Sequence, residues 1–133
     1  MTFSPAAADT ICEHLRATGT TAEDYDVILT GDLGKLGKQL ACELIKQNGF
    51  DISQKLNDCG CMIFYPEQTA PMGGSGCGCA SVVFNGFVKN QLETGKIKSV
   101  LLAATGALLS PTSSFQGENI PGISYALSFR REQ

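Results

Sequence analysis

The segment that most constrains the fold is IKSVLLAAT, residues 97–105, in which nearly every residue is apolar. Continuous apolar runs of this length are typical of strands that are buried on both faces of a sheet. A sheet of that kind needs helices packed on it. The surrounding run SVLLAATGALL is interrupted by Gly106 and is shorter than the roughly 18 residues of a membrane span, so we expect no transmembrane segment.

Three other segments have the apolar spacing of amphipathic helices. Ser4 is placed to cap the first helix, Pro5 suits its first position, and Gly19 is placed to end it. The second predicted helix ends at Asn48-Gly49 and the third ends near Gly95. Their apolar faces are Ala8, Ile11, Cys12 and Leu15, then Leu36, Leu40, Ala41, Leu44 and Ile45, and then Ala80, Val83, Phe84, Phe87 and Val88.

Besides the apolar run, three segments are predicted to be strands. They are Val27–Thr30, CMIFY at residues 61–65, which Pro66 stops, and IPGISYALSF at residues 120–129. The last one alternates large and small residues, so its two faces differ. The order α-β-α-β-α-β-β predicts an α/β fold with a mixed, mostly parallel sheet and packed helices. Because crossovers normally join two strands, the opening helix leads us to expect a first strand upstream of this sequence.

Composition excludes several classes of protein. The 133 residues suit one ordinary domain, and their net charge is −3 without a basic patch, so we expect no nucleic-acid partner. MTFSPAAAD has no basic segment followed by an apolar core, so no secretion signal is visible. Without such a signal, the six cysteines indicate reduced thiols rather than a disulfide framework.

Four of these cysteines form two closely spaced pairs, Cys59-Gly60-Cys61 and Cys77-Gly78-Cys79. Four thiolates can bind zinc, but structural zinc sites favour two to four residues between paired ligands, and here there is one. A disulfide between the pairs is a further alternative. We favour small thiols packed at the ends of elements, with no metal and no cofactor.

The second pair lies in MGGSGCGCASVV, a glycine-rich loop that precedes the third predicted helix. The free N–H groups at a helix start attract anions, but no lysine follows as in a P-loop. A nucleophile elbow at Ser75 would need a histidine partner. His14, the chain's one histidine, lies within the first predicted helix, where we expect a surface or rim position without a catalytic role.

The segment LTGDLG places Asp32 just after the first predicted strand. Ligands of α/β sheets bind beyond the carboxyl ends of the strands, so Asp32 is well placed to line a site. The same carboxylate could cap the next helix. Both interpretations stand, and they are compatible.

Several of these segments together resemble a known family. SPAAADTI, YDVILTGDLG, DCGCMIFY, GGSGCGCASVV and VLLAATGALLSPTS, with QGENIPGISYALS, are similar to the C-terminal half of the stage V sporulation protein AD family, in the thiolase-like superfamily. The resemblance implies two similar halves, each with a mixed five-stranded sheet, stacked in layers. Residues 1–133 would form one C-terminal thiolase-like domain whose first strand lies outside the sequence.

The resemblance also bears on catalysis. At three positions where condensing relatives carry acid–base residues, this chain has Thr30-Gly31-Asp32-Leu33, Glu67-Gln68-Thr69 and Ala104-Thr105-Gly106-Ala107. The superfamily's nucleophilic cysteine belongs to the other half. The resemblance therefore implies a protein that is not an enzyme. The alternative is a thiolase-like or ketoacyl-synthase-like acyltransferase whose nucleophile lies in an N-terminal half.

The family resemblance implies binding of dipicolinic acid, as its calcium chelate, and a role in its uptake into the developing spore. The expected partners are membrane proteins of that transport system, an N-terminal thiolase-like half and a second copy in a homodimer. The expected location is intracellular, in the developing spore and peripheral to its inner membrane. The residues expected at the ligand are Asp32, Gln68, Gly74, Ser75, Gly76, Thr105 and Gly106.

Overall fold

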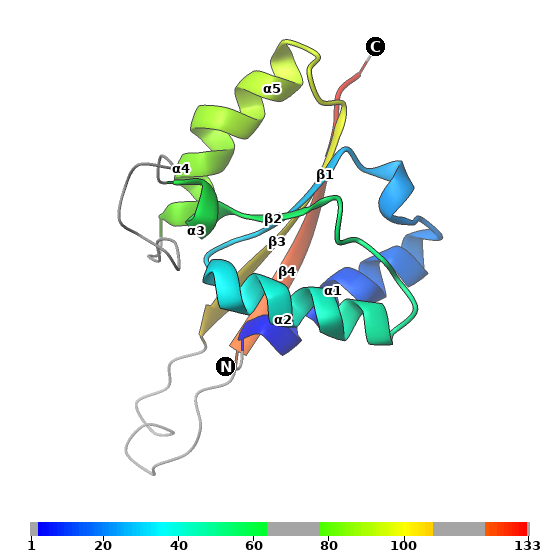
Figure 1. Ribbon diagram of the computed structural model, residues 1–133. Helices are drawn as coiled ribbons and strands as arrows, with labels where there is room; N and C mark the ends of the chain where they lie inside the picture. Colours follow the sequence, from blue (N-terminus) through cyan, green and yellow to red (C-terminus); the bar gives the residue numbers. More distant parts are fainter. Residues whose placement is uncertain (1–2, 64–77, 108–121, 133) are drawn as a thin grey trace.

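The structure is a computed structural model that describes residues 3–63, 78–107 and 122–132. Within these residues one sheet has the strand order β2-β1-β3-β4 (Figure 1). Strand β1 is parallel to both β2 and β3, whereas β3 and β4 are antiparallel. The predicted class, a mixed and mostly parallel sheet with packed helices, is confirmed. The strands are β1 (Val27–Thr30), β2 (Leu56–Asp58), β3 (Ser99–Ala107) and β4 (Gly122–Arg130).

Two helices, α1 (Phe3–Thr18) and α2 (Gly34–Gln47), cover one face of the sheet (Figure 1). Ile28 of β1 and Leu101 of β3 point to this face and belong to a core cluster with the apolar residues of α1. The short 3₁₀ turn η1 (Ala22–Asp24) leads from α1 into β1. Fully or almost fully buried in this cluster are Ala8, Ile11, Cys12, Leu15, Tyr25, Ile28, Ile45, Ile52, Leu101 and Ala103.

One continuous helical stretch covers the opposite face, built from α4 (Cys79–Val83), η2 (Phe84–Val88) and α5 (Lys89–Glu93) (Figure 1). Leu29 and Leu102 point to this side, next in sequence to Ile28 and Leu101 on the other. Because neighbouring residues of β1 and β3 are buried on opposite faces, the predicted burial of the apolar run on both faces is confirmed.

The middle segment of this helical stretch, η2, is a π-helical turn, and it changes the predicted apolar face. A π turn adds about one residue per turn, which rotates the following side chains relative to α-helical spacing. Val88 is buried as predicted, but Phe87 is 52% exposed. The assignment of Phe87 to the apolar face was therefore wrong.

The apolar face of α2 also differs from the predicted one. Leu36 and Leu40 are exposed, whereas Gly37, Ala41 and Ile45 are buried. The hydroxyl of Ser4 donates a hydrogen bond of 3.0 Å to the Gly37 carbonyl oxygen, so α1 and α2 approach closely at this point. Ala41, Leu44 and Ile45 of the predicted face do pack against the core, so the prediction was wrong for Leu36 and Leu40, and Gly37 lies at the contact instead.

Two predicted element boundaries were wrong. Helix α1 already begins at Phe3, so Ser4 lies inside its first turn and contacts α2 instead of capping α1. The second strand is Leu56–Asp58, and the predicted strand start at Cys61 lies in α3 (Cys59–Met62). Periodicity cannot separate a short apolar strand from a short helix. The predicted helix ends are confirmed, because Gly19, Gly49 and Gly95 follow the helices with positive φ.

Candidate ligand site at the carboxyl ends of the strands

The candidate site lies where the parallel strands β1, β2 and β3 end. The register aligns Thr30 with Asp58 of β2 and with Ala103 of β3, so the residues after them meet at one edge of the sheet. The N–H group of Gly60 donates a 3.0 Å hydrogen bond to the Gly31 carbonyl oxygen, which joins the segments after β1 and β2. This is the edge at which α/β sheets bind ligands.

Asp58 connects three segments at this edge through the hydrogen bonds that its carboxylate accepts. Its fully buried carboxylate accepts a hydrogen bond of 2.6 Å from the Thr30 hydroxyl. It also accepts hydrogen bonds of 3.0 Å from the backbone N–H groups of Leu33 and Gly34. These donors belong to the start of α2, so Asp58 caps that helix from a neighbouring strand and complements its dipole.

Asp58 was missed by the sequence reasoning, which offered Asp32 as the cap of α2. A cap is ordinarily sought next to the helix in sequence, and Asp58 comes from a different strand. The sequence held one signal for Asp58, its position directly before Cys59-Gly60-Cys61. Because the second strand was predicted at residues 61–65 and not at Leu56–Asp58, Asp58 was not recognised as the last residue of a strand.

The structure brings together Asp32 and Thr105, two of the residues that were predicted to bind a ligand. The Thr105 hydroxyl donates a hydrogen bond of 3.4 Å to Oδ1 of Asp32. Both side chains are partly buried, and they come from the segments after β1 and near the end of β3. Asp32 therefore lies partly exposed at this edge, in contact with the end of β3.

Of the other residues that were predicted to bind the ligand, the structure describes only Gly106. Gly106 belongs to β3, next to Thr105, and pairs with Ile123 of β4. Gln68, Gly74, Ser75 and Gly76 lie outside the described residues. Their roles remain predictions.

Three thiols lie at this edge, on α3 and at the start of α4. Burial, with the carboxylate of Asp58 next in importance, raises the pKa of Cys59 to about 12. Burial followed by the charge of Asp32 raises the pKa of Cys79, and burial followed by Asp58 raises that of Cys61. A thiol with a raised pKa remains protonated at neutral pH and is a poor nucleophile and metal ligand. Among the described residues, no three His, Cys, Asp or Glu side chains are grouped to hold a metal ion.

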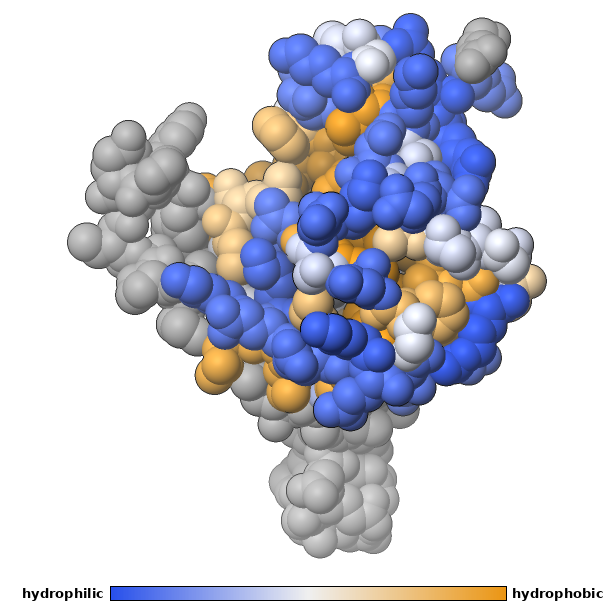
Figure 2. Space-filling view, turned by 45° about the vertical axis from the view of Figure 1, so that its right-hand side comes forward, coloured by the Kyte–Doolittle hydropathy of each residue, from blue (hydrophilic) through white to orange (hydrophobic). Residues whose placement is uncertain are grey.

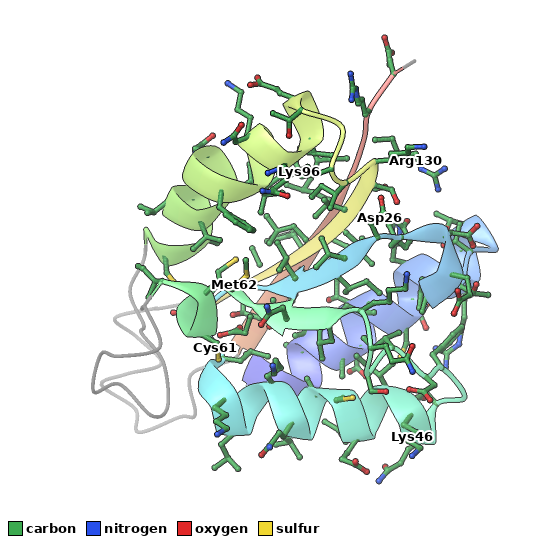
Figure 3. All side chains as sticks on the ribbon, turned by 45° about the horizontal axis from the view of Figure 1, so that its top comes forward. Asp26, Lys46, Cys61, Met62, Lys96 and Arg130 are labelled. Carbon is green, nitrogen blue, oxygen red and sulfur yellow. The ribbon has the colours of Figure 1, made fainter. Side chains whose placement is uncertain are left out.

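His14 belongs to the opposite end of the sheet. Its Nε2 lies 2.7 Å from the hydroxyl of Tyr25, a buried residue just before β1. Figure 3 shows Asp26, the next residue, and Arg130 at one end of the sheet, with Cys61 and Met62 at the other. The partly buried histidine is thus tied to the amino end of β1, away from Asp32 and Thr105.

Comparison with known proteins identifies the family. A model of the family described as Stage V sporulation protein AD (SpoVAD) matches residues 1–130. The chain belongs to the stage V sporulation protein AD family. Over 129 residues it is 45% identical to Stage V sporulation protein AD of Bacillus subtilis (strain 168). The resemblance noted in the sequence is confirmed, and membership of this family supports a role in sporulation.

The match covers 97% of this chain but 38% of the Bacillus subtilis protein, at its C-terminal part. More than half of that family member therefore lies outside the match. No helix in the described part of the chain is both long and apolar enough to cross a bilayer.

Proposed function

We propose that this chain is the ligand-binding C-terminal part of a non-catalytic sporulation protein that holds dipicolinic acid and assists its uptake into the developing spore. The observation that carries the proposal is the contact between Asp32 and Thr105 at the carboxyl edge of the sheet, in a member of this family. The carboxylate and the hydroxyl are polar groups that can orient a small ligand.

The charge of the edge favours the calcium chelate over the free dianion. Asp32 and Asp58 both bring a carboxylate to this edge, and after burial their charges are further causes of the raised pKa values of Cys59 and Cys79. A free dicarboxylate would be repelled by these groups. A calcium chelate carries no net charge and presents a cation that prefers carboxylate oxygens. Because Asp58 is buried in its cap, Asp32 is the carboxylate that would meet this cation.

The chemistry of the edge supports a binding role rather than acyl transfer. The thiols of Cys59, Cys61 and Cys79 have raised pKa values, and the one histidine is bound to Tyr25 at the other end of the sheet. Acyl transfer needs an activated nucleophile with a base nearby, so the described part of this chain offers neither at the edge, and both would have to come from an N-terminal half. The proposal also places the protein at the inner spore membrane, as a homodimer with membrane proteins of the transport system as its partners.

The test is a calorimetric titration of calcium dipicolinate, of dipicolinate with a chelator of free calcium, and of an acyl-CoA. The titrations use the chain alone and the chain joined to the part of the Bacillus subtilis relative that precedes the match. We expect calcium dipicolinate to bind most tightly, and Asp32→Asn to weaken it by about tenfold or more. Asp9→Asn, which removes an exposed carboxylate from α1, is the matched control and should leave binding unchanged. The proposal would be contradicted if the protein turned over acyl-CoA in a thiol-dependent reaction and the titration with dipicolinate gave no heat of binding.

A further inference from the structure

Basic residues from two distant segments meet where β3 begins and β4 ends. The antiparallel register pairs Ser99 of β3 with Arg130 of β4. The backbone N–H of Arg131 donates a hydrogen bond of 2.8 Å to the Lys98 carbonyl oxygen. Figure 3 shows Lys96 and Arg130 at this end of the sheet. Four of the chain's ten lysine and arginine residues therefore belong to two neighbouring segments that lie far apart in the sequence, 96–98 and 130–131.

A hollow of about 430 Å³ lies at this end of the sheet, opposite to the end that carries Asp32 and Thr105. Its volume is in the range of pockets that bind small molecules, roughly 300–1,000 Å³. Three basic side chains, two acidic ones and one serine line it. The amino-end hollow, as we call it, consists of Asp24, Lys98, Ser99, Arg130, Arg131 and Glu132.

Both guanidinium groups of the hollow have a fixed neighbour. The Cζ atom of Arg130 lies 5.8 Å from the ring centroid of Tyr25, a buried residue, in a cation–π contact. The Arg131 guanidinium lies against the backbone at the end of α5, because a side chain on Gly95 would collide with it. The two cations are thus positioned at the hollow by the fold, which lowers the cost of ordering them around a ligand.

The charges around the hollow leave its cations unpaired. The two ion pairs among the described residues lie elsewhere, in α1 and α5, so none of the three cations has a carboxylate partner there. The carboxylate of Asp24 accepts a hydrogen bond of 2.8 Å from the Thr21 N–H within its own turn. Asp26, which does not line the hollow, accepts hydrogen bonds from the backbone N–H groups of Lys98 and Ser99. Both aspartates are therefore satisfied by the backbone, and the hollow suits an anion.

We propose that the amino-end hollow binds a phosphate monoester group through the guanidinium groups of Arg130 and Arg131 and the ammonium group of Lys98. These three side chains have more N–H donors than one carboxylate can accept. A phosphate monoester carries up to two negative charges on three terminal oxygens, which match the paired donors of a guanidinium group. The group can belong to a soluble phosphate ester or to a lipid headgroup. Neither Asp32 nor Thr105 takes part, so the site is independent of the proposed function.

The test is a calorimetric titration of the chain with glycerol phosphate at constant ionic strength, so that general screening of charge does not change. At about pH 7.5 this ester is a dianion. Succinate, a dicarboxylate of the same charge, is titrated in parallel. We expect saturable binding of glycerol phosphate and binding of succinate that is about tenfold weaker. Absence of saturable binding, or tighter binding of succinate, would overturn the proposal.

Arginine variants locate the site. Arg130→Gln and Arg131→Gln should each weaken the binding of glycerol phosphate by about tenfold, because each removes charged donors. Arg16→Gln is the matched control, since Arg16 of α1 also lies 5.8 Å from a ring centroid, that of Phe50, and its loss changes the net charge equally. Circular dichroism checks that each variant is folded. Equal weakening by all three variants would show that net charge, and not the hollow, attracts the ligand, and would overturn the proposal.

Vesicles distinguish the two sources of the phosphate group. The chain is sedimented with vesicles of phosphatidylcholine alone and with vesicles that also contain phosphatidic acid, whose headgroup is a phosphate monoester. Sedimentation that requires phosphatidic acid, and that glycerol phosphate and Arg131→Gln both reduce, would assign the site to a lipid headgroup. Binding of glycerol phosphate without sedimentation would assign it to a soluble ester. Either result supports a phosphate site at the amino-end hollow.

Discussion

The two faces of the sheet are covered to different extents by the described residues. Helices α1 and α2 lie on one face, where Leu101 and Ile28 are fully buried. The single stretch α4–η2–α5 lies on the other face, where Leu127 and Tyr125 of β4 are more than half exposed. Figure 2 shows hydrophobic residues also exposed in the middle of a largely hydrophilic side of the molecule.

This difference shows that two equally hydrophobic residues of one strand pair can contribute unequally to the stability of the isolated chain. Leu101 and Leu127 belong to neighbouring strands and have the same side chain, yet one has lost contact with water and the other has not. Burial, and not residue type, determines how much a leucine stabilises the isolated chain. Substitutions on the two faces should therefore differ in their effect on the free energy of unfolding.

Leu101→Ala should have the largest effect. Removing a fully buried leucine leaves a cavity, and we expect the free energy of unfolding to fall by about 3 kcal/mol. Leu127→Ala in the isolated chain should change it by less than about 0.5 kcal/mol. Urea denaturation followed by circular dichroism measures both values, and equal losses would show that the two faces are equally covered.

Asp58→Asn should have the next largest effect, because it acts on the cap shared by β2 and α2. The amide has one acceptor oxygen, so one of the N–H donors of Leu33 and Gly34 loses its partner and faces an NH₂ group. We expect a loss of about 2 kcal/mol in unfolding free energy. Asn57, the partly buried neighbour, offers a control through Asn57→Asp, which should cost less. Equal stabilities of Asp58→Asn and the parent chain would refute the capping role.

Val88 and Phe87 test the π turn on the less covered face. Val88 is 1% exposed, so Val88→Ala should lower the free energy of unfolding by about 1.5 kcal/mol. Phe87→Ala, at a side chain that is 52% exposed, should change it by less than about 0.5 kcal/mol. The opposite ranking in thermal denaturation would show that the helix is α-helical throughout and that Phe87 faces the sheet.

The Cys59 thiol should have the smallest effect on the free energy of unfolding at neutral pH, because its contribution changes only in alkaline solution. Its pKa is about 12 in the folded chain, above the ordinary value of 9.0, so folding favours the protonated thiol. The resulting stability is fully present below pH 9 and is lost as the pH rises toward 12. Unfolding measured between pH 7 and pH 11 should show this loss, with a shallower slope for Cys59→Ala. An identical slope for the variant would mean that the thiol does not contribute.

Parts of this architecture could be predicted because they depend on local sequence. Val27–Thr30 was predicted with its correct bounds, since it is a short apolar run between polar residues. The ends of the three long helical segments were indicated by glycines, which favour the positive φ at these positions. The position of Asp32 just after a strand, at the carboxyl edge of the sheet, followed from its place directly behind the apolar run 27–30.

The rest depended on contacts between distant segments. Asp58 caps a helix that precedes it by more than twenty residues, and Ser4 bonds to Gly37 of another helix. The π turn moves Phe87 outward without any local sequence signal. The alternation in β4 correctly predicted two different faces, but it could not show that the side with Tyr125 and Leu127 would be the exposed one.

The most direct test of the unequal covering is the effect of Leu127→Ala on the free energy of unfolding in two settings. One is the isolated chain, and the other is the chain joined to the preceding part of the Bacillus subtilis relative. We predict a change below about 0.5 kcal/mol in the first and a loss of about 2 kcal/mol in the second. Leu36→Ala, at 53% exposure on α2, should have the same small effect in both. An equally small effect of Leu127→Ala in both settings would contradict the account.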